Sequence, residues 1–385
     1  MHKIERLLQT LAPKGVEFRK LGEVLEYDQP NKYCVTGKEF DESYPTPVLT
    51  AGKTFILGYT NEKDNIYQAS KSSPVIIFDD FTTATQWVDF PFKVKSSAMK
   101  ILLPKNPTIN IRFIFFYMQT IPYNISGEHK RQWISRYSQI TIPIPPLEIQ
   151  QEIVKILDAF TELNTELKAR KKQYQYYQNM LLDFKDANQN HKDAKEKLAQ
   201  KTYPKNLKTL LQTLAPKGVE FKTLEEVFEI KNGYTPSKNN PEFWEKGTIP
   251  WFRMEDIREN GRILKDSIQH ITPKALKNKK LFPKNSIIIS TTATIGEHAL
   301  LIVDSLANQQ FTFLSKKANC DIVLDMKFFF YQCFLLGEWC KKNTNVSGFA
   351  SVDMTAFKKY KFPIPPLEIQ QEIVKILDQF SVLTT

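Results

Sequence analysis

Apolar residues recur every three or four positions along one long stretch in the middle of this chain. The seam positions are Ile149, Ile153, Ile156, Phe160, Leu163, Leu167, Tyr174, Tyr177, Leu181 and Phe184, and only Arg170 interrupts the series. This heptad spacing predicts a helix whose narrow apolar stripe packs against another helix as a coiled coil. Pro145 and Pro146 mark its start, because proline is tolerated in the first turn of a helix and not inside it. A helix of roughly 38 residues would span about 57 Å.

Short runs of β-branched and aromatic residues lie before and after this helix, bounded by turn residues. They are 47–50, 74–78, 90–94 and 99–103 in the first segment, and 286–290 and 311–314 in the second. Such runs are typical of strands. The apolar stretches 111–119 and 326–339 have the composition of core helices. The pattern therefore predicts a mixed α/β domain in each segment.

Two phrases of the sequence occur twice, residue for residue. Leu7–Phe18 (LLQTLAPKGVEF) returns as Leu210–Phe221, and Pro143–Asp158 (PIPPLEIQQEIVKILD) returns as Pro363–Asp378. The sequence between the phrases differs, so the repeat indicates two unlike domains held in one frame and not a solenoid. We expect the first variable domain at 1–146, a central helix and linker at 147–202, the second variable domain at 203–366, and the start of a second helix at 367–385.

The charge of the chain favours a polyanionic partner. The 385 residues carry a formal net charge of +11, and a basic excess of this kind makes DNA or RNA the first candidate. No apolar run reaches the roughly 20 residues of a membrane span, and the N-terminus lacks the pattern of a signal peptide. The cysteines Cys34, Cys320, Cys333 and Cys340 have neither metal-ligand spacing nor neighbouring histidines, which is typical of a reducing compartment. We expect a cytoplasmic protein without a membrane segment.

Catalytic motifs are missing from the sequence. Gly52-Lys53-Thr54 resembles the end of a phosphate-binding loop, but Pro47 stands where such a loop needs a glycine. No glycine-rich loop follows a strand in the way that S-adenosylmethionine or dinucleotide sites require, and the five histidines form no triad. Asp79-Asp80 lacks the companion Glu and Lys of a nuclease, so we expect it to make local hydrogen bonds or to accept from a cytosine amino group. These absences favour a binding protein over an enzyme.

The repeated phrases and the helix together resemble the specificity subunit of type I restriction–modification systems. The resemblance covers essentially the whole chain, and the segments 232–238, 249–257 and 308–311 look like a target recognition domain of that family, as do 47–59 and 77–100. It implies an α+β fold with two structurally similar mixed α/β target recognition domains joined by a long coiled-coil helix. It also implies a non-catalytic subunit that reads a bipartite target in double-stranded DNA. Modification (methyltransferase) subunits would bring S-adenosylmethionine, and restriction (translocase and nuclease) subunits would bring ATP, so the chain itself would hold neither cofactors nor metals.

Candidate DNA-contacting residues are polar and basic positions that, as a set, are enriched where the two variable segments differ, since basic groups contact phosphates and polar groups on loops contact base edges. In the first domain they are Thr50, Lys53, Thr54, Thr82, Thr83, Thr85, Gln86, Ser96, Ser97, His129, Lys130 and Arg131. In the second they are Tyr234, Thr235, Ser237, Lys238, Arg253, Asp256, Thr291, Thr292, Thr294, Gln309 and Gln310. The basic run Lys168, Arg170, Lys171 and Lys172 on the helix is either a solvated face or a contact to DNA or to a modification subunit.

The second long helix departs from the family pattern. The family implies a second helix as long as the first, and here the sequence stops a turn or two into it. An apolar seam without a partner is costly. We therefore expect either a homodimer through the central helix or a truncated form that needs a partner to cover the seam.

Two other functions stay open at this point. One is a stand-alone two-domain DNA-binding regulator, which would not co-purify with a methyltransferase. The other is an enzyme with an unrecognised motif, which would methylate or cleave DNA by itself. RNA binding is disfavoured because the aromatic pattern of RNA-binding sheets is absent.

Overall fold

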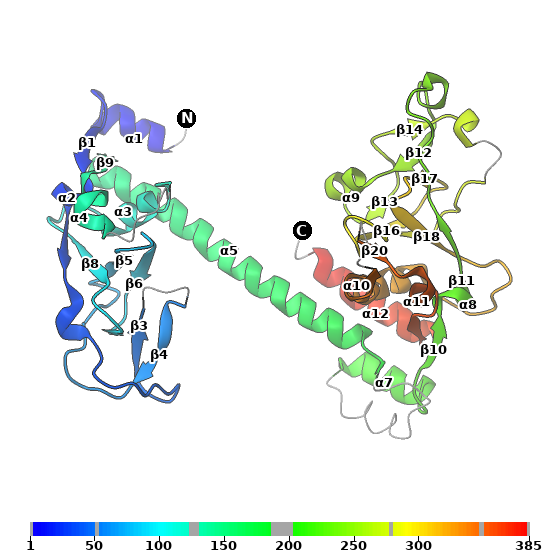
Figure 1. Cartoon of the computed structure of the whole chain (residues 1–385), viewed down its shortest axis with the longest axis horizontal. Helices are drawn as coiled ribbons and strands as arrows, with labels where there is room; N and C mark the ends of the chain where they lie inside the picture. Colours follow the sequence, from blue (N-terminus) through cyan, green and yellow to red (C-terminus); the bar gives the residue numbers. More distant parts are fainter. Residues whose placement is uncertain are drawn as a thin grey trace. The chain divides into compact units, whose positions relative to one another are not determined.

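The computed structural model describes residues 3–50, 54–122, 131–185, 203–276, 280–345 and 350–382. The contacts divide the chain into two compact units, Met1–Glu166 and Leu167–Thr385 (Figure 1). No helix among these described residues is long and apolar enough to cross a membrane.

The described residues of the first unit form a four-stranded sheet, a three-stranded sheet and a further pair of antiparallel strands. Its elements are α1 (Lys3–Leu11), β1 (Glu17–Lys20), α2 (Leu21–Val24), β2 (Leu25–Asp28), β3 (Thr46–Leu49), β4 (Ile56–Thr60), β5 (Val75–Asp79), β6 (Thr85–Val88), β7 (Lys93–Val94), β8 (Met99–Pro104), α3 (Ile111–Met118), α4 (Gln132–Ser135) and β9 (Thr141–Ile144). One sheet has the antiparallel order β2-β8-β5-β6 and the other the order β4-β3-β7. The strand β5 is buried along its whole length, as its continuous apolar run predicts.

The second unit repeats this plan with additions. Its elements are α7 (Lys205–Leu214), β10 (Glu220–Thr223), α8 (Leu224–Val227), β11 (Phe228–Asn232), β12 (Ile249–Phe252), α9 (Met254–Asn260), β13 (Ile263–Leu264), β14 (His270–Ile271), β15 (Ser286–Ser290), β16 (His298–Leu301), β17 (Leu306–Ala307), β18 (Phe311–Lys316), α10 (Met326–Lys342), β19 (Thr344–Asn345), β20 (Ser351–Val352), α11 (Met354–Lys358), β21 (Lys361–Ile364) and α12 (Leu367–Val382). Its main sheet has the order β11-β18-β15-β16-β13, and β14-β12-β17 forms the smaller sheet.

The two units therefore share one topology. The order β2-β8-β5-β6 corresponds to β11-β18-β15-β16, and in each smaller sheet the central strand pairs antiparallel with one neighbour and parallel with the other. The prediction of two structurally similar mixed domains is confirmed. The predicted strand at 286–290 and the predicted helix at 111–119 also form, as β15 and α3.

The repeated phrases meet in an identical joint in both units. Strand β1 pairs antiparallel with β9, placing Phe18 opposite Pro143, and β10 pairs with β21, placing Phe221 opposite Pro363. Figure 1 shows β1 and β9 side by side where the long helix begins. Each variable segment is thus inserted between two strands that the repeat holds constant.

The helix after each main sheet supplies much of the core. Phe113 and Ile114 of α3 lie in one apolar cluster with the sheet residues Ile76 and Phe78. In the second unit α10 is 17 residues long and fills a larger cluster, and it packs against the buried His298 of β16. Burial lowers the pKa of His298 to about 3, so the imidazole is neutral at physiological pH.

The long helix α5 runs without interruption over Leu147–Leu182, close to the predicted bounds. Its apolar seam is buried at the two ends, at Ile149 and at Leu181. In between, Phe160, Leu163 and Leu167 are 59%, 60% and 37% exposed. The predicted seam therefore exists, and its middle part is uncovered in the chain.

The expectation that α5 lacks a helix partner within the chain is wrong for its last turns. Leu181 and Phe184 belong to one core with α7, α10 and α12, and the ring of Tyr177 stacks on Phe380 of α12 with centroids 5.1 Å apart. Figure 1 shows α12 running back alongside the end of α5. The second helix is also longer than the expected one or two turns, because α12 forms 16 residues.

Candidate nucleic-acid interface

In the first unit, the turn that follows β5 is fixed by its own side chains. The Asp79 carboxylate accepts from the backbone N–H of Phe81 at 2.9 Å and from the Thr82 hydroxyl. Thr83 has a φ of +59° and is nearly buried. Such an Asx turn tolerates the left-handed residue because the side chain satisfies the backbone donors. Thr82 is left exposed at the tip.

A second loop lies against this turn and completes what we call the first polar edge, residues 80–85 and 96–98. The backbone N–H of Asp80 donates to the carbonyl of Ala98 at 3.2 Å, which places Ser96 and Ser97 beside the turn. Thr85 accepts from the Gln119 amide, and Gln86 is exposed on the adjoining strand. The structure therefore brings together most of the threonines and serines that the sequence singled out in this domain.

A buried ion pair supports the first polar edge from below. Asp80 is 1% and Lys100 is 2% exposed, and the Lys100 Nζ lies 3.7 Å from the Asp80 carboxylate and donates to Gln29. Burial lowers the pKa of Lys100, while Asp80 opposes this effect. The second Asp80 oxygen accepts from the N–H of Trp133 at 2.8 Å, which fixes the start of α4. Arg131, the N-cap of α4, is exposed there.

Other predicted residues of the first domain lie elsewhere. Thr50 and Thr54 belong to the connection between β3 and β4, in the smaller sheet. Lys53, His129 and Lys130 lie outside the described residues.

In the second unit, three loops meet at the corresponding end of the main sheet. This second polar edge comprises residues 232–235, 290–294 and 307–310. The Thr235 hydroxyl donates to Gln309, and the Gln310 amide donates to the Thr294 hydroxyl at 2.8 Å. Six predicted residues are therefore neighbours here: Thr235, Thr291, Thr292, Thr294, Gln309 and Gln310. Gln309 is exposed, whereas Thr291 is buried and bonded to Thr312 at 3.0 Å.

Gly233 allows these loops to approach one another. A Cβ on Gly233 would lie 2.3 Å from the carbonyl oxygen of Ala307 and 2.5 Å from that of Asn308. Only glycine fits such an approach of two backbones. The residue type at position 233 is thus required by the geometry of the edge.

Arg253 lies beside the second polar edge, and Asp256 fixes the backbone of Arg253. The backbone N–H of Asn308 donates to the carbonyl of Phe252, so Arg253 follows directly beside the 307–310 loop. Its Nε–H has no hydrogen-bond acceptor among the described residues. The expected base contact by Asp256 is wrong, because its side chain is 0% exposed and its oxygens accept from the N–H groups of Arg253 and Ile268, both at 2.6 Å.

Two of the three remaining predicted residues, Tyr234 and Ser237, bond to groups outside the loops of the second polar edge. The Tyr234 hydroxyl donates to the carbonyl of Ala275, which turns its ring into the smaller core. Ser237 and Lys238 are exposed in the loop that follows, where the Ser237 carbonyl accepts from the Trp244 indole at 2.9 Å. The sequence reasoning missed Asn232 and Asn308, whose side chains accept from Thr312 and from the N–H of Gln310. The Asn232-Gly233 dipeptide is typical of a turn, and it was the pattern in the sequence that could have indicated Asn232.

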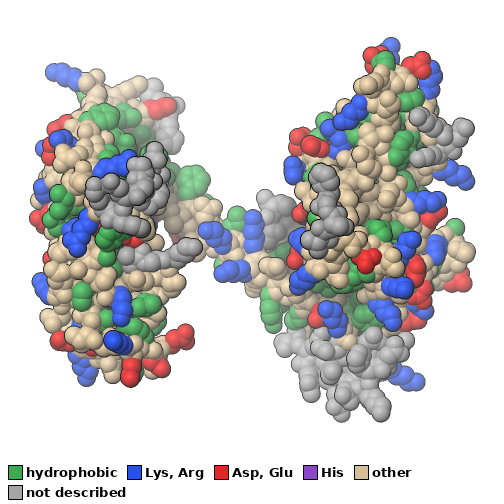
Figure 2. Space-filling view, viewed as in Figure 1, with side chains coloured by type: hydrophobic (Ala, Val, Ile, Leu, Met, Phe, Trp, Pro, Cys, Tyr) green, Lys and Arg blue, Asp and Glu red, His purple; other side chains and the backbone are tan. Residues whose placement is uncertain are grey.

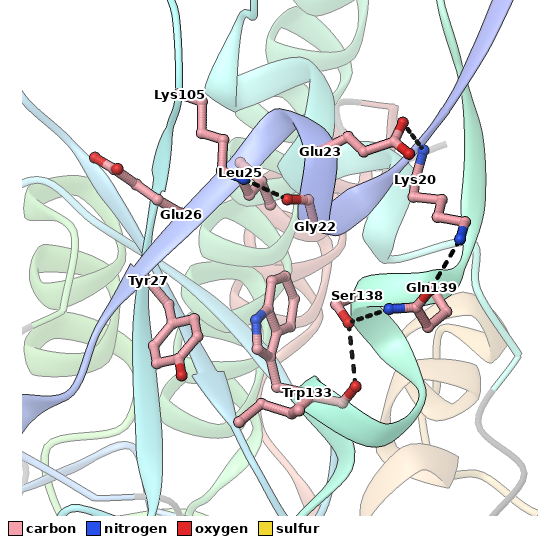
Figure 3. Close-up of a pocket in the computed structure, with 11 residues that line it drawn as sticks. Lys20, Gly22, Glu23, Leu25, Glu26, Tyr27, Lys105, Trp133, Ser138 and Gln139 are labelled. Atoms are coloured by element: carbon pink, nitrogen blue, oxygen red, sulfur yellow. Dashed lines mark hydrogen bonds between the residues drawn. The ribbon is translucent and has the colours of Figure 1, made fainter.

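The hollow in Figure 3 lies at the joint of the first unit and not at the polar edge. Several of its polar groups are bonded to one another: the Lys20 amine donates to Gln139, and the Lys105 amine donates to the carbonyl of Gly22 at 2.6 Å. Within the described ranges, no three His, Cys, Asp or Glu side chains gather as metal ligands would. Figure 2 shows Lys and Arg spread among acidic side chains on both units, with basic side chains on the exposed stretch of α5.

Comparison with known proteins identifies the family. The model of the type I restriction modification DNA specificity domain matches twice, at residues 13–174 and 216–385. The chain belongs to the type I restriction–modification DNA specificity family. Each unit therefore carries a copy of a domain for DNA sequence specificity.

Individual members of the specificity family support this assignment. The EcoR124I/EcoR124II specificity subunit of Escherichia coli is 42% identical over 100% of this chain and 90% of its own length. The Escherichia coli EcoprrI specificity subunit is 59% identical over 43% of each chain. The crystal structure of the S subunit from M. genitalium has a TM-score of 0.59 at 14% identity, covering 96% of this chain and 90% of that one, which shows the same fold.

Proposed function

We propose that this specificity protein reads one half of a split target in double-stranded DNA with each unit, through the first and second polar edges. The observation that carries this proposal is that one topology presents unlike polar side chains at the same place. Ser96 and Ser97 stand before β8, whereas Asn308, Gln309 and Gln310 stand before the corresponding strand β18. Exposed hydroxyls and amides such as Thr82 and Gln309 can bond to base edges. The Arg253 side chain is 28% exposed beside the second polar edge, so its guanidinium can contact a phosphate or a base edge.

The catalytic steps are assigned to partner subunits. Modification subunits would supply methyl transfer with S-adenosylmethionine, and restriction subunits would supply ATP-driven translocation and cleavage, while this chain works without a cofactor in the cytoplasm. The exposed basic run at 168–172 of α5 is suited to docking a modification subunit or DNA phosphates. A stand-alone regulator is the less favoured alternative, and the absence of a co-purifying methyltransferase would support it.

Exchanging one variable segment tests the proposed division of labour. Residues 25–139 are replaced by the matching segment of another member of the family, and the chimera is expressed with its modification subunits. Because each unit reads its own half-site, one half of the methylated motif should change and the other should remain. Methylome sequencing is the measurement. A motif that changes in both halves, or in neither, contradicts the proposal.

We further propose that two copies of the chain pair through the exposed middle of α5. The two copies of the repeated helix can be compared at the same position. Leu377 of the second copy is 0% exposed in the core that includes the end of α5, whereas the corresponding Leu157 of the first copy is only partly buried. Leu163 lies close to the middle of α5, so an antiparallel pair of identical helices would set Phe160 of one copy near Leu167 of the other.

Light scattering after size exclusion measures this pairing. The chain should run as a dimer, and Leu163→Glu should raise the dissociation constant at least about tenfold, since the glutamate would be buried at a seam. Thr165→Glu, which adds the same charge away from the stripe, serves as the control. A monomer at high concentration contradicts the pairing.

A further inference from the structure

The first glutamine of the repeated helix ties the helix to its domain. Gln150 is 1% exposed, and its amide nitrogen donates to the carbonyls of Pro145 at 2.7 Å and Thr108 at 3.1 Å. Its amide oxygen accepts from the backbone N–H of Asn110 at 2.8 Å. One buried side chain therefore connects the start of α5 to the loop that leads into α3.

The second unit contains the same contact with a different domain. Gln370 is 0% exposed, donates to the carbonyls of Pro365 at 2.7 Å and Val323 at 3.0 Å, and accepts from the N–H of Asp325 at 2.8 Å. Thr108 and Val323 differ in polarity, since one carries a hydroxyl where the other carries a methyl group. The glutamine bonds only to backbone, so it accepts either sequence.

An aspartate about two turns further along the repeated helix makes a second contact. Asp158 accepts from the Arg112 guanidinium at 2.7 Å and 2.9 Å. Asp378, the matching residue, accepts from the Lys327 amine at 2.6 Å and from the Tyr331 hydroxyl at 2.6 Å. In both units the partner cation stands two residues after the N-cap of the core helix.

The N-cap residue completes the pattern on the domain side. The side chain of Asn110 accepts from the N–H groups of Arg112 and Phe113, and that of Asp325 accepts from those of Lys327 and Phe328. Capping directs the first N–H groups of the helix and fixes where its second residue points. The cap thus presents the cation to the aspartate of the repeated helix.

From these contacts we propose that the repeated helix is a two-point socket for recognition domains. Its glutamine and aspartate hold any domain whose core helix begins with Asn or Asp at the N-cap and carries Arg or Lys two residues later. The glutamine and aspartate are positioning residues, because they set the angle between each polar edge and its own helix. This inference rests on the proposed function for its effect on DNA, and on the contacts alone for its effect on stability.

Neighbouring glutamines provide matched variants in both units. Gln150→Glu places an acceptor against two carbonyl oxygens, whereas Gln151→Glu makes the same change at an exposed position. The melting temperature should fall by about 4–8 °C for the first variant and almost not at all for the second, because two buried carbonyls lose their donor and each such loss shifts the melting temperature of a domain of about 150–250 residues by about 2–4 °C. Gln370→Glu and Gln371→Glu should repeat the result. If the melting temperature fell equally in the buried and the exposed variant of each pair, the proposed socket would be overturned.

Two substitutions of Lys327 test whether its positive charge is what holds the repeated helix. Lys327→Arg should retain the discrimination between targets whose spacers differ by one base pair, and Lys327→Gln should reduce it several-fold while the chain stays folded. Binding of the complex with modification subunits to two duplexes measures this ratio. If Lys327→Arg and Lys327→Gln gave the same ratio of affinities for the two duplexes, the positioning role would be overturned. If the glutamine variants behave as expected but neither half-site is recognised at all, the proposed function fails and the socket stands.

Discussion

Replacing Asp80 with alanine is expected to destabilise the first unit by about 3–5 kcal/mol, because it leaves the buried Lys100 without its counter-charge. Lys100 is 2% exposed and cannot turn to solvent without disrupting the sheet. The substitution also removes the acceptor for the N–H of Trp133 and frees the start of α4. We expect the first polar edge to lose its order together with the unit.

Chemical denaturation of the whole chain measures this loss, with a fluorescent probe in each unit to separate their transitions. The transition of the first unit should move and that of the second should not. Glu39→Ala, which removes an exposed carboxylate from the same unit, is the control and should cost less than about 0.5 kcal/mol.

A double variant distinguishes the buried charge from simple loss of packing. Asp80→Asn with Lys100→Met retains an acceptor for Trp133 and removes both charges, so it should be more stable than the single variant Lys100→Met. A coupling energy of more than about 1 kcal/mol is expected for such neighbours. If the costs of the two single substitutions simply add, the ion pair is not what supports the edge.

The long helix and the buried strands were predictable because their signals are local. The three-and-four spacing from Ile149 onward requires a helix, and it placed α5 within two residues of its observed end at Leu182. The run at 286–290 forms β15 with the predicted bounds. Neither assignment depends on what the rest of the chain does.

The joint was not predictable from the residues that form it. Phe18 pairs opposite Pro143, and nothing in either phrase states that they are partners. The repeat showed that both phrases are kept constant without showing that they touch. The contacts of Gln150 could not be predicted for the same reason, because the sequence does not show which backbone groups a glutamine in a helix will bind.

The polar edges were predicted in part. Thr82 and Gln309 follow strands, and connections between strands are where binding residues gather. Asp256 was wrongly assigned because polarity was weighed without local geometry: it stands three residues after Arg253, the spacing of a capping box. The hydroxyl of Tyr234 donates to the carbonyl of Ala275, which is 41 residues away in the sequence, and no local pattern predicts such a contact.

Gly233→Ala is expected to abolish recognition by the second unit while leaving that of the first. The added Cβ would lie 2.3 Å from the Ala307 carbonyl oxygen, so the end of β11 and the 307–310 loop must separate. This movement breaks the contact between Thr235 and Gln309. We expect a loss of about 1–3 kcal/mol in stability, as for other overpacked sites.

The decisive measurement is the cost of mismatches in each half-site. With the unaltered chain, bound to its modification subunits, a wrong base pair in either half should cost about 1–3 kcal/mol of binding free energy. With Gly233→Ala, mismatches in the second half should cost almost nothing further, while those in the first half keep their cost. Gly261→Ala is the control: Gly261 has a φ of +78° and no neighbour within 4 Å of an added Cβ, so alanine strains the backbone of α9 without moving the edge. A Gly233→Ala chain that still discriminates bases in the second half would show that recognition by this unit does not depend on the 232–235 and 307–310 loops.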